Sequence, residues 1–256
     1  MVEIIDTHCH LDNEQFKTDR EDIMTKCQAK GISKIVVPAI ARSNWDVVIQ
    51  LCHKYDMLYP ALGLHPMLID QHSDDDIKML DHYLSQNTVI AVGEIGLDFY
   101  DKTANKVKQQ RFFDAQLQLA QQYQLPVLLH VRKAHSDVIA SLKKYSIPGG
   151  IAHAFNGSME VAQEYIKLGF KLGFGAVVTY ERASKIRRLA ADLPLQSIVL
   201  ETDAPDMAGS LHHGERNSPE FLDEALSVLA TLRQVTKEEI AAQTTKNARE
   251  LFKGSL

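Results

Sequence analysis

The stretch that decides the fold is Ile4-Ile5-Asp6-Thr7-His8-Cys9-His10. The apolar run 2–5 is typical of a buried strand, and it leads directly into two histidines spaced two residues apart. Side chains at positions i and i+2 of a strand point to the same side, so both imidazoles can converge on one point. Neutral imidazole is the commonest metal ligand in proteins. The His8–His10 pair therefore predicts a divalent-cation site, provided that the rest of the chain supplies further ligands.

Beyond this strand, the chain alternates strand-like and helix-like segments with no linker rich in proline, glycine or serine. The predicted strands are 2–5, 34–39, 59–64, 89–93, 126–129, 150–152, 170–174 and 198–200. The predicted helices are 14–30, 43–55, 74–85, 104–123, 136–145, 158–168, 181–192 and two that begin near Ser218 and Thr236. This pattern predicts a (β/α)₈ TIM barrel that occupies residues 1–256 as one domain. An open doubly wound sheet usually has a glycine-rich phosphate loop after the first strand, and the sequence DTHCHL contains none.

The composition excludes several other classes of protein. Hydrophobic residues make up 45% of the 256 residues and charged residues 24%, which is typical of a globular chain with an ample core. No apolar run approaches the roughly 18 residues of a membrane span, and no signal peptide is apparent. Three cysteines without CxxC spacing favour a reducing compartment, so we expect a cytoplasmic monomer without membrane partners. A net charge of −5 does not suggest nucleic-acid binding through overall positive potential.

Ionisable residues follow most of the predicted strands. In a TIM barrel the active site lies at the carboxyl ends of the strands, so these side chains are expected to share one rim. The expected metal ligands are His8, His10, Glu94, His130, His153 and Asp203. Four histidines and two carboxylates exceed what one tetrahedral zinc needs and suit two divalent ions with a carboxylate able to bridge them. Mixed nitrogen and oxygen ligands are compatible with Zn, Mn, Mg or a similar cation.

Each of these residues also has a purely structural interpretation. Glu94 could be a buried carboxylate paired with Arg132, and Asp203 could cap the turn before Pro205. A single histidine at a strand end is more often a hydrogen-bonded loop residue than a ligand. The structural interpretation must nevertheless place six such residues on one rim by coincidence, and we therefore favour the metal site.

Seven motifs occur in order over nearly the whole chain. They are DTHCHL (6–11), GLHP (63–66), GEIGLDFY (93–100), LLHVRKA (128–134), HAFNGS (153–158), ETDAP (201–205) and RNSPEFL (216–222). This set resembles the TatD family of metal-dependent hydrolases, which are amidohydrolase-like TIM barrels, and ETDAPDM and the chain length are most similar to its YjjV-type bacterial members. The resemblance implies a two-metal site and phosphodiester hydrolysis. In this family that activity is known as DNase activity, including 3′-to-5′ exonuclease action.

The resemblance also implies a role for each expected ligand. It implies that His8 and His10 bind the first metal, that His130 and His153 bind the second, and that Glu94 bridges the two. Asp203 would also bind the first metal and would accept a proton from the attacking water. Two departures from the family pattern flank the expected pocket. HAFNGS replaces the common HCFSG, and Asp206 stands where many members have an aromatic residue. Both departures concern substrate preference.

Five further residues are candidates for substrate binding or support. His65 could donate to a phosphate oxygen or be a loop histidine before proline, and Arg132 could meet phosphate with two hydrogen bonds or pair with an acid. Arg216 and Asn217 precede a helix start, where anions are favoured, or simply cap that helix. Glu201, two residues before Asp203, could support a ligand histidine or form a buried salt bridge.

Three functions follow from these residues. The first is a divalent-metal-dependent phosphodiesterase that acts on DNA ends, with Asp203 and Glu94 as catalytic residues. The second is hydrolysis of a small ester, lactone, amide or phosphoester at the same site, which the acidic net charge favours slightly. The third is a metal-binding or nucleic-acid-binding module without catalysis, which predicts no turnover with any metal.

Overall fold

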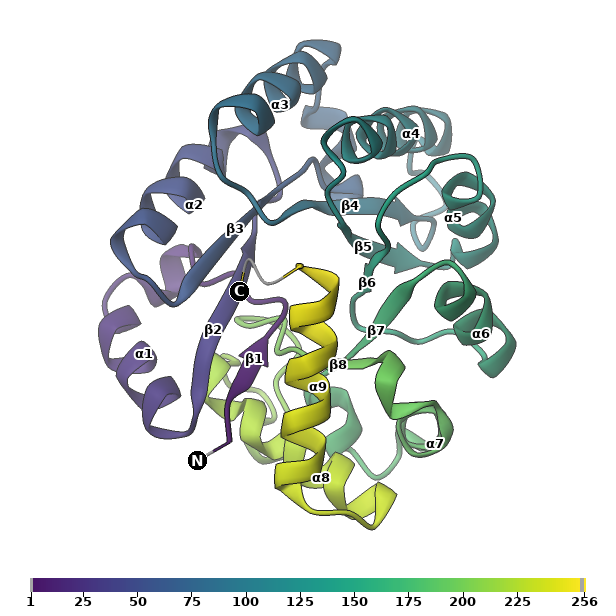
Figure 1. Cartoon of the computed structure of the whole chain (residues 1–256). Helices are drawn as coiled ribbons and strands as arrows, with labels where there is room; N and C mark the ends of the chain where they lie inside the picture. The colour runs from purple at the N-terminus through teal and green to yellow at the C-terminus, as the bar shows by residue number, and fades with distance from the viewer. Residues whose placement is uncertain (1, 254–255) are drawn as a thin grey trace.

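Eight parallel strands form a barrel in the computed structural model, which describes residues 2–253 and 256 (Figure 1). They pair in chain order as β1 (Ile4–Asp6), β2 (Ile32–Pro38), β3 (Leu58–Leu62), β4 (Ala91–Asp98), β5 (Val127–Arg132), β6 (Gly150–Ala152), β7 (Phe170–Phe174) and β8 (Ile198–Leu200). The chain returns from β8 to β1 through hydrogen bonds from Thr7 N to Leu200 O (3.0 Å) and from Asp203 N to His8 O (2.8 Å). The predicted TIM barrel is confirmed.

Helices follow the strands and surround the barrel (Figure 1). They are α1 (Arg20–Ala29), α2 (Arg42–Lys54), α3 (Asp74–Gln86), α4 (Lys106–Tyr123), α5 (His135–Leu142), α6 (Met159–Lys167), α7 (Ser184–Asp192), α8 (Leu222–Arg233) and α9 (Lys237–Leu251). Within the described part of the chain, none of these helices is both long and apolar enough to cross a bilayer. The helix predicted at 14–30 begins only at Arg20, because Glu14–Phe16 forms a separate 3₁₀ turn that buries Phe16.

The barrel has two apolar layers because side chains alternate along each strand. Ile35 and Val37 of β2 belong to the large core between strands and helices, whereas Val36 between them points into the barrel. The inward layer includes Ile151 of β6 and Val199 of β8, and the C-terminal Phe252 packs against it. In Figure 1, α9 lies across the barrel and brings the chain end to its centre. One end of the barrel is thus filled with apolar side chains, which leaves the opposite end for polar groups.

The fourth strand differs from the prediction that it ends before Glu94. β4 continues to Asp98, and its pairing with β5 shifts register between Val92 and Ile95. Both Val92 and Ile95 belong to the outer core although they are three residues apart, a spacing that strict alternation would place on opposite faces. An irregularity of this kind redirects a side chain, and here it turns Glu94 to the inside of the barrel.

Truncating the aromatic ring at the filled end of the barrel should destabilise the fold without touching the polar end. Phe252 is 3% exposed and packs in the inward layer, so Phe252→Ala is expected to lower the free energy of unfolding by about 3–5 kcal/mol. Urea denaturation followed by circular dichroism measures this change. Lys246→Ala on the exposed face of α9 is the matched control, and equal stability of the two variants would contradict this packing.

Candidate metal centre

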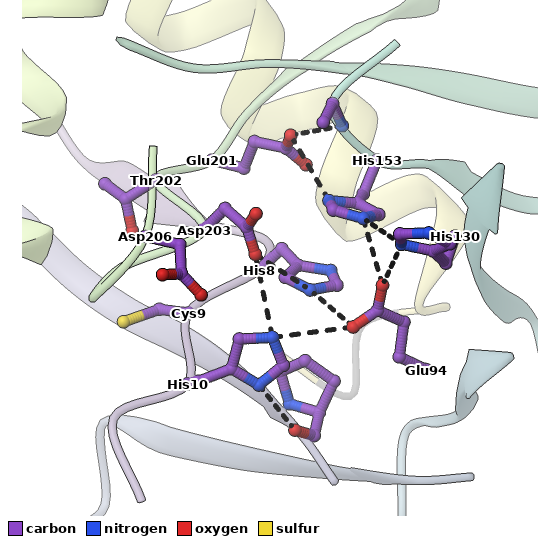
Figure 2. A network of polar contacts seen from close by, with 12 residues as sticks. His8, Cys9, His10, Glu94, His130, His153, Glu201, Thr202, Asp203 and Asp206 are labelled. Carbon is purple, nitrogen blue, oxygen red and sulfur yellow. Dashed lines mark hydrogen bonds and ion pairs between the residues drawn. The ribbon is translucent and has the colours of Figure 1, made fainter. Parts of the chain in front are cut away.

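The Glu94 carboxylate lies at the centre of a group of buried and half-buried histidines (Figure 2). Its Oε2 is 3.3 Å from His8 Nε2 and 3.4 Å from His10 Nε2. Its Oε1 is 2.9 Å from His153 Nε2 and 3.2 Å from His130 Nδ1, and these two nitrogens are 3.5 Å apart. The four histidines therefore form two pairs, one at each oxygen of the same carboxylate.

Asp203 completes the first of these pairs. Its Oδ1 is 3.6 Å from Nε2 of both His8 and His10. The residue has a φ of 57°, in the left-handed region that aspartate and asparagine tolerate better than most residues. The bond from its backbone N–H to His8 O holds this turn against β1 and keeps the carboxylate over the two imidazoles. The structure thus brings together all six residues expected as metal ligands.

Two of the histidines have their outer nitrogens occupied. His10 donates from Nδ1 to Pro38 O (3.1 Å), which leaves the Nε2 lone pair facing Glu94 and Asp203. His130 donates from Nε2 to the carboxylate of Asp98 (2.9 Å), which leaves Nδ1 facing the centre. A histidine that ligates a metal usually donates its other ring N–H to a carbonyl or a carboxylate. Both rings therefore have the orientation of a metal ligand, with one nitrogen turned to the centre.

His65 lies in the same cluster, but it turns a ring N–H rather than a lone pair toward the centre. Its Nδ1 accepts a hydrogen bond from Met67 N (3.2 Å), so the proton of the neutral ring is on Nε2. That nitrogen is 3.1 Å from Glu94 Oε1 and donates to it. Although His65, Glu94 and His130 present ligand atoms within 4.8 Å of one another, the ring in this tautomer acts as a donor. His65 therefore orients Glu94 or donates to a bound anion.

The charges of the cluster balance around Glu94. Burial opposes its ionisation, but His65, His153 and His8 hold the pKa of its carboxyl well below the ordinary value. Burial also opposes a charge on His153, yet Glu94 and Asp203 outweigh burial and raise the pKa of this ring to about 10. Burial lowers the pKa of His8 to about 4. Protons on some of the imidazoles thus neutralise the carboxylates, and a divalent cation would replace those protons.

The residues fit a divalent cation, judging from polar atoms that find no protein partner. Both ring nitrogens of His8 are buried without a hydrogen bond, and so are His153 Nδ1 and Glu201 Oε2. Buried polar atoms are almost always paired, so a cluster of orphaned ones is what a cation-binding site would present. The donor set of imidazole and carboxylate is the one that zinc, manganese and similar cations accept.

Three acidic residues support the cluster from outside. Glu201 accepts from Ala154 N (2.5 Å) and lies 3.8 Å from His153 Nδ1, and burial raises the pKa of this carboxyl to about 8. Asp6 accepts from His8 N (3.1 Å) and Thr202 Oγ1 (2.6 Å), which ties the first strand to the segment after β8. Asp98 holds His130. Asp98 was not among the residues expected at the site, because the fourth strand was predicted to end at residue 93 and Asp98 lies on its continuation.

The centre opens into a cavity of about 700 Å³ at the carboxyl ends of the strands. His65 and Arg132, both expected to bind substrate, line its wall. Arg216 and Asn217 do not line it in the described part of the chain, which does not support their expected contact with substrate. Arg216 pairs with Asp19, and the buried Asn217 donates to Thr202 O (2.9 Å) and Asp206 O (2.8 Å). Their hydrogen bonds hold the loop after β8.

A TIM barrel with clustered histidines and carboxylates at the carboxyl ends of its strands is typical of metal-dependent hydrolases, and comparisons with known proteins give the particular family. The family described as "TatD related DNase" matches residues 5–253. The chain belongs to the TatD family and is a metal-dependent hydrolase.

Individual relatives cover almost the whole chain. The Escherichia coli K12 "uncharacterized metal-dependent hydrolase YjjV" is 42% identical over 97% of each chain, and the crystal structure of the E. coli K12 protein described as "YJJV, TATD homolog" superposes over 98% of each with a TM-score of 0.94. A zebrafish (Danio rerio) "putative deoxyribonuclease tatdn3" is 31% identical and covers 97% of this chain and 96% of its own length. The family resemblance noted from the motifs is confirmed.

Proposed function

We propose that the protein is a phosphodiesterase that acts on DNA ends with two divalent ions. The observation that carries this proposal is the Glu94 carboxylate, whose two oxygens each face one pair of histidines at the floor of the cavity. His8 and His10 with Asp203 would hold one ion, and His130 and His153 the other. All of these residues belong to one chain, so the proposed centre needs no residue from a second copy.

When bound, divalent cations at such a centre lower the pKa of a water and polarise a phosphoryl oxygen. The chain itself supplies the other parts of the reaction. Asp203, with its side chain 15% exposed, accepts the proton of the attacking water. His65 donates a hydrogen bond from Nε2, either to Glu94 or to a substrate oxygen. Arg132 offers the planar donors that suit a phosphate.

DNA is favoured as the substrate by the family description and by the printed name of the zebrafish relative. A specific observation supports the second candidate, a small ester, lactone, amide or phosphoester. Arg132 is the one lysine or arginine among the described residues that line the cavity, and Asp12 and Asp206 line it as well. Contacts to a run of phosphates normally require several cations, whereas a small substrate needs none beyond the centre itself.

Activity with two kinds of substrate separates the candidates. Single-stranded oligonucleotides and chromogenic small esters would be incubated with the purified protein after chelation and again with added Zn²⁺, Mn²⁺ or Mg²⁺. We expect mononucleotides to be released only when a metal is present, and elemental analysis to find about two ions per chain.

Hydrolysis of the small esters without any release of nucleotides would favour the second candidate. Absence of turnover with every metal and every substrate would instead indicate a binding module.

A further inference from the structure

An exposed tyrosine stacks on an arginine that lines the cavity. Tyr100 is 59% exposed, unlike most large apolar or aromatic side chains of this protein. The guanidinium of Arg132 lies over its ring, 3.6 Å from the ring centroid, which is the closest cation–ring contact among the described residues. Arg132 also lines the cavity and ends the strand that carries His130. The stacked pair is therefore next to the metal centre in both sequence and space.

The pair is fixed to the centre through backbone and carboxylate bonds. Asp98 accepts from Tyr100 N at Oδ1 and from His130 Nε2 at Oδ2, each at 2.9 Å. Phe99 N donates to Arg132 O (2.8 Å), and Asp98 itself is held at both backbone atoms by the side chain of Gln109. The backbone of Tyr100 consequently keeps a defined position relative to the imidazole of His130.

Comparison with similar pairs elsewhere in the molecule shows what is unusual about Arg132. Arg216 lies over Phe16 and Arg111 over Phe112, but each of these guanidinium groups is also paired with a carboxylate, Asp19 or Asp74. Arg182 lies over Tyr180 without an ion pair among the described residues, but unlike Arg132 it does not line the cavity. The guanidinium of Arg132 makes no ion pair or side-chain hydrogen bond within residues 2–253 and 256. Its edge donors remain available to a ligand in the cavity while its face rests on Tyr100.

We propose that the Tyr100–Arg132 pair is a stacking platform for a base of one of the two nucleotides that flank the scissile phosphodiester. A flat aromatic base stacks on tyrosine rings and guanidinium planes, whichever of the bases it is. The edge of Arg132 then remains free for a phosphate oxygen. This inference rests on the proposed function, because it requires a substrate that carries a base.

The test is a double-mutant cycle between the enzyme and its substrate. The wild type and Tyr100→Ala are compared on three oligonucleotides: one intact, one whose terminal nucleotide lacks its base and one whose penultimate nucleotide lacks it. We expect Tyr100→Ala to raise KM about tenfold on the intact oligonucleotide. Removal of the base at the stacked position should raise the wild-type KM similarly and abolish the difference between the two proteins. Tyr100→Phe, which retains the ring, should restore the dependence on the base.

The controls separate this platform from a structural role of Tyr100. Val107→Ala, at an exposed site of α4, should behave as the wild type, and metal content should be equal in all variants. A wild type that releases nucleotides with the same KM whether or not a base is present would overturn the platform but leave the proposed nuclease. A wild type that hydrolyses none of the three oligonucleotides would overturn both.

Discussion

Glu94→Gln should reduce hydrolysis by about a thousandfold or more, because it removes the charge that both histidine pairs share. Glutamine keeps the shape of the side chain but turns one carboxylate oxygen into an NH₂ group. That group would face either His8 and His10 or His130 and His153, so at least one pair loses its carboxylate oxygen from Glu94. We expect kcat/KM to collapse and the metal content to fall by about one ion per chain or more.

Elemental analysis and steady-state kinetics at saturating metal concentrations measure these two effects. Glu220→Gln is the matched control, since Glu220 is a buried glutamate that bonds to Ser218 and does not line the cavity in the described part of the chain. It should retain both its metal and its activity. Near-normal hydrolysis by Glu94→Gln would show that Glu94 does not join two cations, and the proposed mechanism would fail with it.

The rim on which these residues meet could be predicted from the sequence. The sequence repeats short apolar runs that end in histidine, with amphipathic helices between them. The rule that barrel strands run parallel and end on one side then places these histidines on one rim. Strands β6, β7 and β8 have the predicted bounds. His8 and His10 needed only the two-residue period of a strand to be placed side by side.

Glu94 and Arg216 show where this reasoning stops. The inward direction of Glu94 depends on a shift of register between β4 and β5, which arises from the pairing of the two strands. Because β4 is buried along its whole length, its sequence does not show which side chains face inward. Arg216 was expected to bind substrate because it precedes a helix start. Its guanidinium instead forms an ion pair with Asp19, which lies almost 200 residues earlier in the chain. The sequence alone does not show that two residues so far apart are in contact, because the folded barrel brings them together.

The chemical assignments have a similar limit. The sequence indicates that a histidine lies near a metal, but the hydrogen bond at its other nitrogen decides whether it can ligate. His10 and His130 donate outward and leave a lone pair for a cation, whereas His65 accepts from Met67 N and donates inward. Three histidines at strand ends thus divide into two roles through contacts with a carbonyl, a carboxylate and an amide.

Asp203→Asn should separate catalysis from metal binding. Asparagine tolerates the left-handed φ of 57° at this position, so the backbone and its bond to His8 O should persist, which alanine would not ensure. His8, His10 and Glu94 remain as ligands, and most of the metal should therefore stay bound. The carboxamide cannot accept the proton of the attacking water, so we expect kcat to fall by about a thousandfold with little change in metal content.

Asp206→Asn provides the comparison within the same cavity. Asp206 lines the cavity and carries the same charge, but it has no ion pair with a described histidine, so its loss should change kcat only a few-fold. If Asp203→Asn loses its metal as fully as Glu94→Gln does, Asp203 is a ligand first and its role as proton acceptor is unproven. If Asp203→Asn keeps both its metal and its rate, the proton of the attacking water leaves by another route. His65, which donates to Glu94, would then be the next residue to substitute.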